Sequence, residues 1–337
     1  MQIKIDQALF RKAMNKKVTI VAYHYVRELK FSRYPQIKGL DTALFKEQIA
    51  YIKKHYQVIT MEQLIVSIDN NKALPDKALL LTFDDAYIDH FTQVFPVLVE
   101  NKIQGSFFPP AKAIRDHTVL EVNKIHHILA SNTEAARIKA EIFKLLDENR
   151  NEYGLDSNEF YYDQLAIADR FDTADVIFIK RLLQRGLPEK LRNRITDQLF
   201  EKFIGLSEPV FSRELYMTLD QIQMMHKAGM HIGSHGFDHY WLDSLPVEEQ
   251  EQEIIKSMEF LQQIGVDISN WTMCYPYGGY DQLTIELLKK YNCKLALTVD
   301  LGIAEASTKN RFVLPRLDTN DLPKDSSAAL NDWYQEG

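Results

Sequence analysis

Two pairs of polar residues in this chain have the types and spacing to do chemistry. Asp84 and Asp85 are adjacent and follow an apolar run in the sequence LLLTFDDAY. His235 and His239 lie four residues apart in GSHGFDHYW. Two imidazoles at this spacing can converge on one ion, and a carboxylate from another strand would complete a two-His, one-carboxylate site. The pattern predicts a divalent metal site in which one aspartate is a ligand and the other takes a proton.

Each pair also has a plain structural interpretation. An aspartate pair can cap the helix that follows it, and histidines four apart are common on protein surfaces. The metal site is favoured because His235 directly follows a strand that ends in small residues, and a second acidic strand end is available. A divalent ion lowers the pKa of a bound water toward ~7, so a carboxylate base suffices at neutral pH.

Strand and helix patterns alternate on both sides of these residues. The expected strands are 18–25, 78–83, 105–108, 230–234, 271–275, 293–299 and 311–317. Helices are expected between them, with caps at Asp41, Thr60 and Thr218. This alternation is typical of parallel β/α units and predicts a barrel or barrel-like sheet. In such folds chemistry sits where the strands end, which is where both polar pairs, His24 and the turn YPYGGYD fall.

The region from about 113 to 215 has a different character. It is rich in Glu, Lys, Arg, Leu and Ile at helical spacing, and strand signals are nearly absent. We therefore expect a barrel domain formed by 1–112 and 216–325, interrupted by a mostly helical insertion over 113–215. The insertion could be a lid over the substrate cleft or a dimerisation element.

Composition narrows the class of protein. The 337-residue chain has a net charge of -7, which gives no basic surface for nucleic acid. Its two cysteines imply no disulfide framework. The N-terminus lacks the apolar run of a signal peptide, and no window reaches the ~18 apolar residues of a membrane span. These features predict a cytoplasmic protein without a membrane span.

Three motifs in order carry a resemblance to a known family. TFDD at 82–85, SHGFDH at 234–239 and YPYGGYD at 275–281 resemble the signatures of the polysaccharide deacetylases, the NodB-homology type of carbohydrate esterase. The flanking YHYV at 23–26 and LPRLD at 314–318 fit as well. The similarity covers roughly 18–110 and 216–318, so the helical region lies outside it.

The resemblance implies a distorted (β/α) barrel that removes acetyl groups from amino sugars with one divalent metal. Zn²⁺ is the expected metal, with Ni²⁺, Co²⁺ or Mn²⁺ as alternatives. It makes Asp84 the general base. It makes Asp85, His235 and His239 the metal ligands. The backbone N–H of Tyr277 would be an oxyanion donor. The rings of Tyr275 and Tyr277 could stack on a sugar or simply fill the turn.

The chain departs from the family pattern at several positions. The arginine that often precedes the Pro-Tyr-Gly turn is missing, since Met273 and Cys274 stand there, and Arg316 is expected to orient Asp84 instead. No histidine follows His239, so the C-terminal Leu-x-His acid is absent. His24 is the expected general acid, with a hydrogen-bonded core histidine as the alternative. Ala86 replaces the usual glycine after the aspartates.

Together these features predict a hydrolase of carbon–nitrogen bonds other than peptides. Its substrate would be an N-acetylated sugar of a cell-surface glycan, glycolipid or precursor, and the cytoplasmic expectation favours a soluble or lipid-linked precursor. Alternatives are an O-acetyl esterase or deformylase on the same scaffold, and a glycan-binding protein without turnover. A homo-oligomer formed through the insertion is also possible on these grounds.

Overall fold

The computed structural model describes residues 15–168 and 172–334. The first 14 residues, on which the expected absence of a leader rests, lie outside the described residues. Contacts divide the chain into two compact units. The first unit comprises Met1–Arg27, Leu40–Asp116 and Leu215–Gly337, and the second comprises Glu28–Gly39 and His117–Glu214.

The first unit is built on a nine-stranded sheet in the order β7-β6-β5-β1-β11-β9-β8, with β4 added beside β5 and β10 beside β1. The strands of this sheet are β1 (Lys17–Tyr23), β4 (Gln57–Val58), β5 (Ala78–Asp84), β6 (Ser106–Phe108), β7 (His231–Ile232), β8 (Met273–Cys274), β9 (Ala296–Leu301), β10 (Ala304–Glu305) and β11 (Leu314–Asp318). Neighbours along the main path are all parallel. A parallel bridge between Ser234 and Met273 joins the two ends of the path. The sheet is therefore a distorted (β/α) barrel, which confirms the expected fold class. A separate pair is formed by β2 (Val26–Arg27) and β3 (Leu40–Asp41).

Burial explains why the central strands are apolar throughout. All seven residues of β5, ALLLTFD, are buried, as are six of the seven in β1. Parallel strands are covered on both faces, so their sequences are continuous apolar runs instead of alternating ones. Asp84 ends such a run and is held at the edge of a rigid strand.

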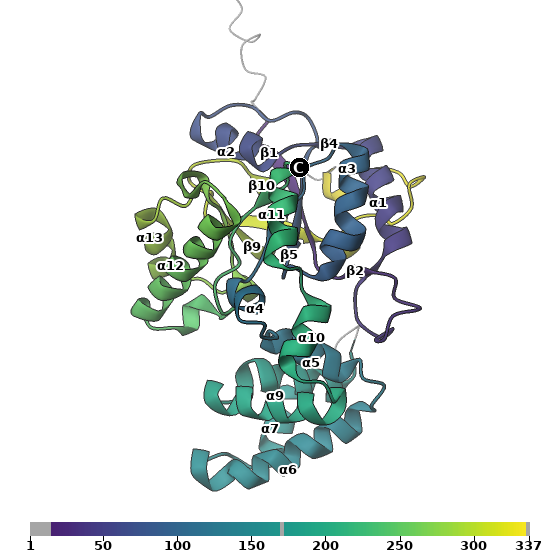
Figure 1. The fold of residues 1–337 in the computed structure, drawn as a ribbon, viewed down its shortest axis with the longest axis vertical. Coiled ribbons are helices and arrows are strands. Elements are labelled where there is room, and N and C mark those ends of the chain that lie inside the picture. The colour runs from purple at the N-terminus through teal and green to yellow at the C-terminus, as the bar shows by residue number, and fades with distance from the viewer. Residues whose placement is uncertain (1–14, 169–171, 335–337) are drawn as a thin grey trace, which may run out of the picture. The chain divides into compact units, whose positions relative to one another are not determined.

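Helices cover this sheet in the first unit. They are α1 (Thr42–His55), α2 (Met61–Asp69), α3 (Phe95–Asn101), α4 (Ala111–Arg115), α11 (Leu219–Lys227), α12 (Val247–Ile264) and α13 (Gln282–Lys290). Figure 1 shows α1 and α3 on one side of the central strands and α12 and α13 on the other. The expected caps are present: Asp41 begins α1, and capping boxes at Thr60 and Thr218 begin α2 and α11.

The second unit is helical. Its helices are α5 (Glu121–Leu129), α6 (Ala135–Tyr153), α7 (Asn158–Leu165), α8 (Ala174–Arg181), α9 (Glu189–Ile204) and α10 (Glu208–Leu215), the last ending at the border with the first unit. The unit also contains 28–39, which the sequence placed in the barrel. Tyr34 there packs edge-on against His127, and Lys38 pairs with Asp172. These contacts explain the assignment, and a lid or dimerisation role for this unit stays a prediction.

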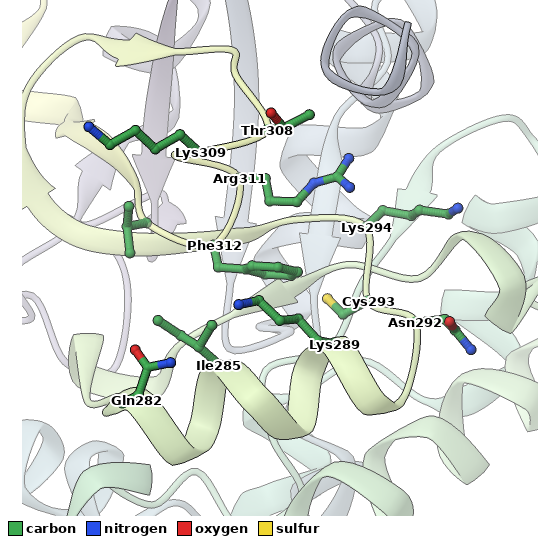
Figure 2. A pocket seen from close by; sticks show the side chains of 11 residues that line it. Gln282, Ile285, Lys289, Asn292, Cys293, Lys294, Thr308, Lys309, Arg311 and Phe312 are labelled. Atoms are coloured by element: carbon green, nitrogen blue, oxygen red, sulfur yellow. The ribbon is translucent and has the colours of Figure 1, made fainter.

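A cavity of about 510 Å³ opens between α13 and segment 308–313 (Figure 2). Its lining includes Cys293 and Lys294, which directly precede β9. The cavity therefore lies at the amino ends of the parallel strands, opposite the carboxyl ends where the predicted site residues fall. The charged heads of Lys294 and Lys309 point away from each other in Figure 2. Within the described ranges, no helix is both long and apolar enough to span a bilayer.

Candidate active site

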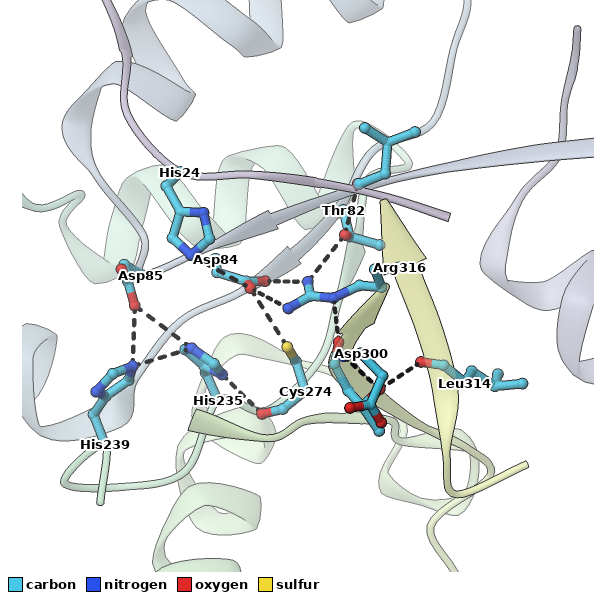
Figure 3. Close-up of polar contacts among 12 residues, drawn as sticks. His24, Thr82, Asp84, Asp85, His235, His239, Cys274, Asp300, Leu314 and Arg316 are labelled. Atoms are coloured by element: carbon cyan, nitrogen blue, oxygen red, sulfur yellow. Dashed lines mark hydrogen bonds and ion pairs between the residues drawn. The ribbon is translucent and has the colours of Figure 1, made fainter. Parts of the chain in front are cut away.

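The ends of the parallel strands bring the predicted residues together (Figure 3). His24 follows β1, and Asp84 ends β5 with Asp85 directly after it. His235 and His239 lie in the loop after β7, and Arg316 lies in β11. Because parallel strands share one carboxyl edge, residues that are more than 200 positions apart in sequence meet here.

Three of these side chains converge on one point. His235 Nε2 lies 3.5 Å and His239 Nε2 lies 3.4 Å from Asp85 Oδ1, and the two Nε2 atoms lie 3.2 Å apart. Ligands of a tetrahedral ion with bonds of ~2.0–2.1 Å are separated by about 3.3–3.4 Å. The nearly equilateral triangle therefore has the size that a tetrahedral metal requires.

The hydrogen bonds around the triangle also fit a cation. His235 Nδ1 lies 2.7 Å from the Cys274 carbonyl, an acceptor, so Nδ1 carries the proton and Nε2 presents its lone pair. Asp85 Oδ1 is buried and has no hydrogen-bond partner among the described residues. Burial lowers the pKa of His235 to about 4, which keeps the ring neutral. Asp85 Oδ1 and His235 Nε2 are both electron-pair donors, and they face each other without a proton between them. A cation placed between them would satisfy both atoms.

Asp84, His235 and Cys274 form a second group of possible ligands. This group fits a metal less well, because burial raises the pKa of the Cys274 thiol well above its usual range and a thiol must lose its proton to bind. Asp84 is also bound to Arg316. The group of Asp85, His235 and His239 is the better candidate.

Asp84 is paired with Arg316 on β11. Arg316 Nη1 donates to Asp84 Oδ1 at 3.1 Å, and Arg316 Nη2 lies 2.8 Å from Oδ2. Both side chains are buried, and Arg316 Nε donates to the Thr298 carbonyl at 2.8 Å. Burial alone would raise the pKa of Asp84, but the guanidinium outweighs it and the pKa falls to about 2. Asp84 is therefore a carboxylate at neutral pH, held in a fixed orientation.

Replacing Arg316 by Met tests this pairing. Without the guanidinium, burial is expected to raise the pKa of Asp84 and move the acidic limb of the kcat/KM profile to higher pH.

The same pair affects stability. In the wild type, the lowered pKa of Asp84 stabilises the folded protein above pH ~4, and this stabilisation is lost as the pH falls through about 2. The Met variant should lack this pH-dependent stabilisation. Removing one partner of a buried pair should also cost about 3–5 kcal/mol in urea unfolding. Arg316→Lys keeps the charge and should shift the limb less, whereas an unchanged limb in the Met variant contradicts the pairing.

His24 lies beside Asp84 but faces solvent. Its Nε2 is 3.9 Å from Asp84 Oδ2, and its side chain is 47% exposed. The alternative of a core histidine is therefore wrong. Strand β1 ends at Tyr23 instead of continuing to 25, which leaves His24 at the open edge of the sheet.

The turn after β8 places Tyr277 beside the triangle of Asp85, His235 and His239, which is called the metal triangle below. Tyr277 has a left-handed backbone, with φ 56° and ψ 5°, and its ring lies 4.6 Å from that of His239. The Trp241 indole stacks flat on the Tyr277 ring, with centroids 4.8 Å apart. Left-handed backbone in a bulky residue is strained and persists only where its surroundings hold it, so this stack helps to fix the turn.

Tyr275 does not take the expected place in a sugar site. Its ring is fully buried and stacks on Tyr280, and its hydroxyl donates to the Phe312 carbonyl at 3.1 Å. It offers no surface to a substrate. The prediction that Tyr275 stacks on a sugar is wrong, and its role is to fill the turn.

The sequence did not reveal how Asp85 is held. Tyr87 is buried, and its hydroxyl donates to Asp85 Oδ2 at 2.7 Å, which leaves Oδ1 to face the histidines. The backbones of Asp85 and Ala86 are left-handed, with φ 71° and 54°. Only glycine adopts this conformation without steric cost, so the backbone of Asp85 and Ala86 is strained here. A tyrosine two residues after the aspartate pair was the only signal for this contact.

Comparisons with known proteins identify the family that this chain resembles. The family profile described as polysaccharide deacetylase matches residues 71–154 and 197–317. The match thus includes both ends of the region that the sequence suggested lies outside the family. The poly-beta-1,6-N-acetyl-D-glucosamine N-deacetylase of Escherichia coli K12 is 34% identical over 80 residues, which is 23% of this chain and 12% of that protein.

Solved structures share the fold. The Streptococcus pyogenes deacetylase PplD, in complex with acetate, aligns with a TM-score of 0.54 at 18% identity over 91% of this chain and 93% of its own. The de-N-acetylase of Aggregatibacter actinomycetemcomitans aligns with a TM-score of 0.53 at 17% identity over 93% and 97%. With the profile match over most of the barrel and the three motifs gathered at one edge of it, this chain belongs to the polysaccharide deacetylase family.

Proposed function

We propose that this protein hydrolyses the N-acetyl group of an amino sugar in a cell-surface glycan, glycolipid or precursor. The observation that carries the proposal is that two adjacent carboxylates have different partners. Asp85 Oδ1 faces two imidazole nitrogens at 3.4–3.5 Å, whereas Asp84 is held by Arg316 with a lowered pKa. The name of the Escherichia coli relative supports an N-acetylated hexosamine as the substrate.

Asp85, His235 and His239 would hold one divalent ion, and we propose Zn²⁺ because two imidazoles and one carboxylate suit it. Such an ion supplies an activated water and polarises the acetamide carbonyl. Ni²⁺, Co²⁺ and Mn²⁺ are the alternatives that the same ligands allow.

The protein's own groups would divide the proton transfers. Asp84 takes the proton of the attacking water, since Arg316 keeps it ionised and oriented. The backbone N–H of Tyr277 stabilises the negative oxygen of the tetrahedral intermediate. His24 protonates the departing amine, and its exposed ring is placed beside Asp84 at the open edge. Acetate and a free amino sugar are the products.

Acetate release tests the proposal. The chelator-treated protein is reloaded with each of the four metals and incubated with N-acetylglucosamine oligomers in β-1,6 and β-1,4 linkage. O-acetyl and N-formyl analogues are included. We expect metal-dependent acetate release that is fastest from the N-acetyl substrates, because the family match and the name of the Escherichia coli relative favour an N-acetylated sugar.

The alternatives predict other outcomes of the same experiment. Faster release from the O-acetyl or N-formyl analogues would identify an esterase or deformylase. A protein that binds the oligomers but binds no metal and releases no acetate would be a glycan-binding protein. The grouping of Asp85, His235 and His239 argues against this alternative. A cytoplasmic location, and with it a precursor substrate, stays a prediction that cell fractionation tests.

A further inference from the structure

The loop between the two ligand histidines is held through its backbone. The Phe237 and Asp238 N–H groups both donate to Glu253 Oε2, at 3.0 and 2.9 Å. The preceding Gly236 N–H donates to Ser234 Oγ at 3.2 Å. Three consecutive N–H groups of the loop therefore have a fixed acceptor.

Helix α12 supplies the acceptor Glu253 directly and holds the acceptor Ser234 through Ser257. Glu253 and Ser257 are one turn apart and both buried, and Ser234 Oγ donates to Ser257 Oγ at 2.9 Å. Residues at i and i+4 lie on the same side of a helix, so both reach the loop. Gly236 has φ 73°, and an added Cβ would lie 3.4 Å from Glu253 Oε2, so the carboxylate and the loop fit closely.

The other side of the loop is also anchored. The Ala111 and Lys112 N–H groups at the start of α4 donate to the Gly236 and Phe237 carbonyls, at 3.2 and 2.9 Å. Lys112 also forms an ion pair with Asp238. The loop is thus clamped between α4 and α12, and it ends at His239, whose backbone is left-handed with φ 60°.

We propose that Glu253 is a positioning residue of the metal site, which fixes His239 relative to His235 by holding the loop between them. The inference rests on the metal site of the proposed function. Groups that orient metal ligands are worth ~10–100-fold in metal affinity. Glu253 is the one side chain in the described structure that binds two N–H groups of this loop, so its loss should loosen the ligand geometry directly.

Metal affinity and a spectroscopic signature test this role. Zn²⁺ dissociation constants are measured by chelator competition, and Co²⁺-loaded protein is examined by its visible absorption. Glu253→Ala should weaken Zn²⁺ binding ~10–100-fold and change the Co²⁺ spectrum, because both N–H groups lose their acceptor. Glu253→Gln has the same side-chain length and still offers an oxygen that can accept from both N–H groups. Its Zn²⁺ dissociation constant and Co²⁺ spectrum should therefore be much closer to those of the wild type.

Two further variants separate folding from positioning. Glu253→Asp keeps the carboxyl group but shortens the side chain, and it should also weaken metal binding. This variant tests the proposal if the Ala variant does not fold. Glu249→Ala removes an exposed glutamate one turn earlier on α12 and should match the wild type. Wild-type affinity and an unchanged Co²⁺ spectrum in folded Glu253→Ala or Glu253→Asp would overturn the inference. A wild-type protein that binds no metal would instead overturn the proposed function.

Discussion

Asp84→Asn is expected to lower kcat by about 10²–10⁴-fold while leaving the bound metal in place, because an amide cannot accept the proton that a general base must take. Asparagine keeps an oxygen that can accept from Arg316 Nη1, as Asp84 Oδ1 does at 3.1 Å, but its NH2 group then faces Arg316 Nη2, so the variant should also lose some stability. Acetate release and metal content are measured on the same preparation.

The control for this variant must also remove a buried, paired carboxylate. Asp89 provides it, since Arg27 Nε lies 2.6 Å from Asp89 Oδ2 and the pair is outside the metal triangle. Asp89→Asn should cost stability without the same loss of kcat. A kcat within tenfold of the wild type in Asp84→Asn would remove Asp84 from the role of base, and a loss of metal would show that it is a ligand.

The sequence predicted the fold well because the central strands are buried on both faces. Continuous apolar runs such as residues 78–83 identify parallel strands directly, and β5 spans Ala78–Asp84. The shorter strands were overestimated: β7 and β8 have two residues each, where 230–234 and 271–275 were expected. Apolar runs show which residues are buried. The length of a strand depends instead on how many of its residues hydrogen-bond to the neighbouring strand, and the twist of the sheet limits that number.

The candidate site was predictable where residue type alone decides the chemistry. The carboxylates and histidines follow this rule, and the structure gathers them at one edge. The Asp84–Arg316 pair joins residues 232 positions apart and was expected only from the family resemblance. Contacts made through tertiary structure were missed, such as Glu253 with the histidine loop, or misjudged, such as the burial of Tyr275. Periodicity carries no signal for such long-range contacts.

Asp85→Ala is expected to have the other large effect, the loss of the metal and of turnover with it. The substitution removes the only carboxylate of the triangle in the described structure and leaves two imidazoles, too few ligands to hold a structural or catalytic zinc tightly. Metal content after dialysis should fall from about one equivalent to a small fraction. Because a ligand at 100 times its Kd stabilises a protein by ~2.7 kcal/mol, added Zn²⁺ should raise the Tm of the wild type but not of the variant.

Two companion variants make this result specific to the ion. Asp85→Asn keeps an oxygen for the Tyr87 hydroxyl, which donates to Oδ2 at 2.7 Å, so it isolates the loss of charge from the loss of that hydrogen bond. Asp300→Ala removes an exposed aspartate and should bind metal normally. If Asp85→Ala keeps its metal while Asp84→Asn loses it, the two carboxylates have the reverse roles. Metal loss in Asp85→Ala together with metal retention in Asp84→Asn is the combination that the geometry requires, since only Asp85 has an oxygen facing both histidines while Asp84 is bound to Arg316.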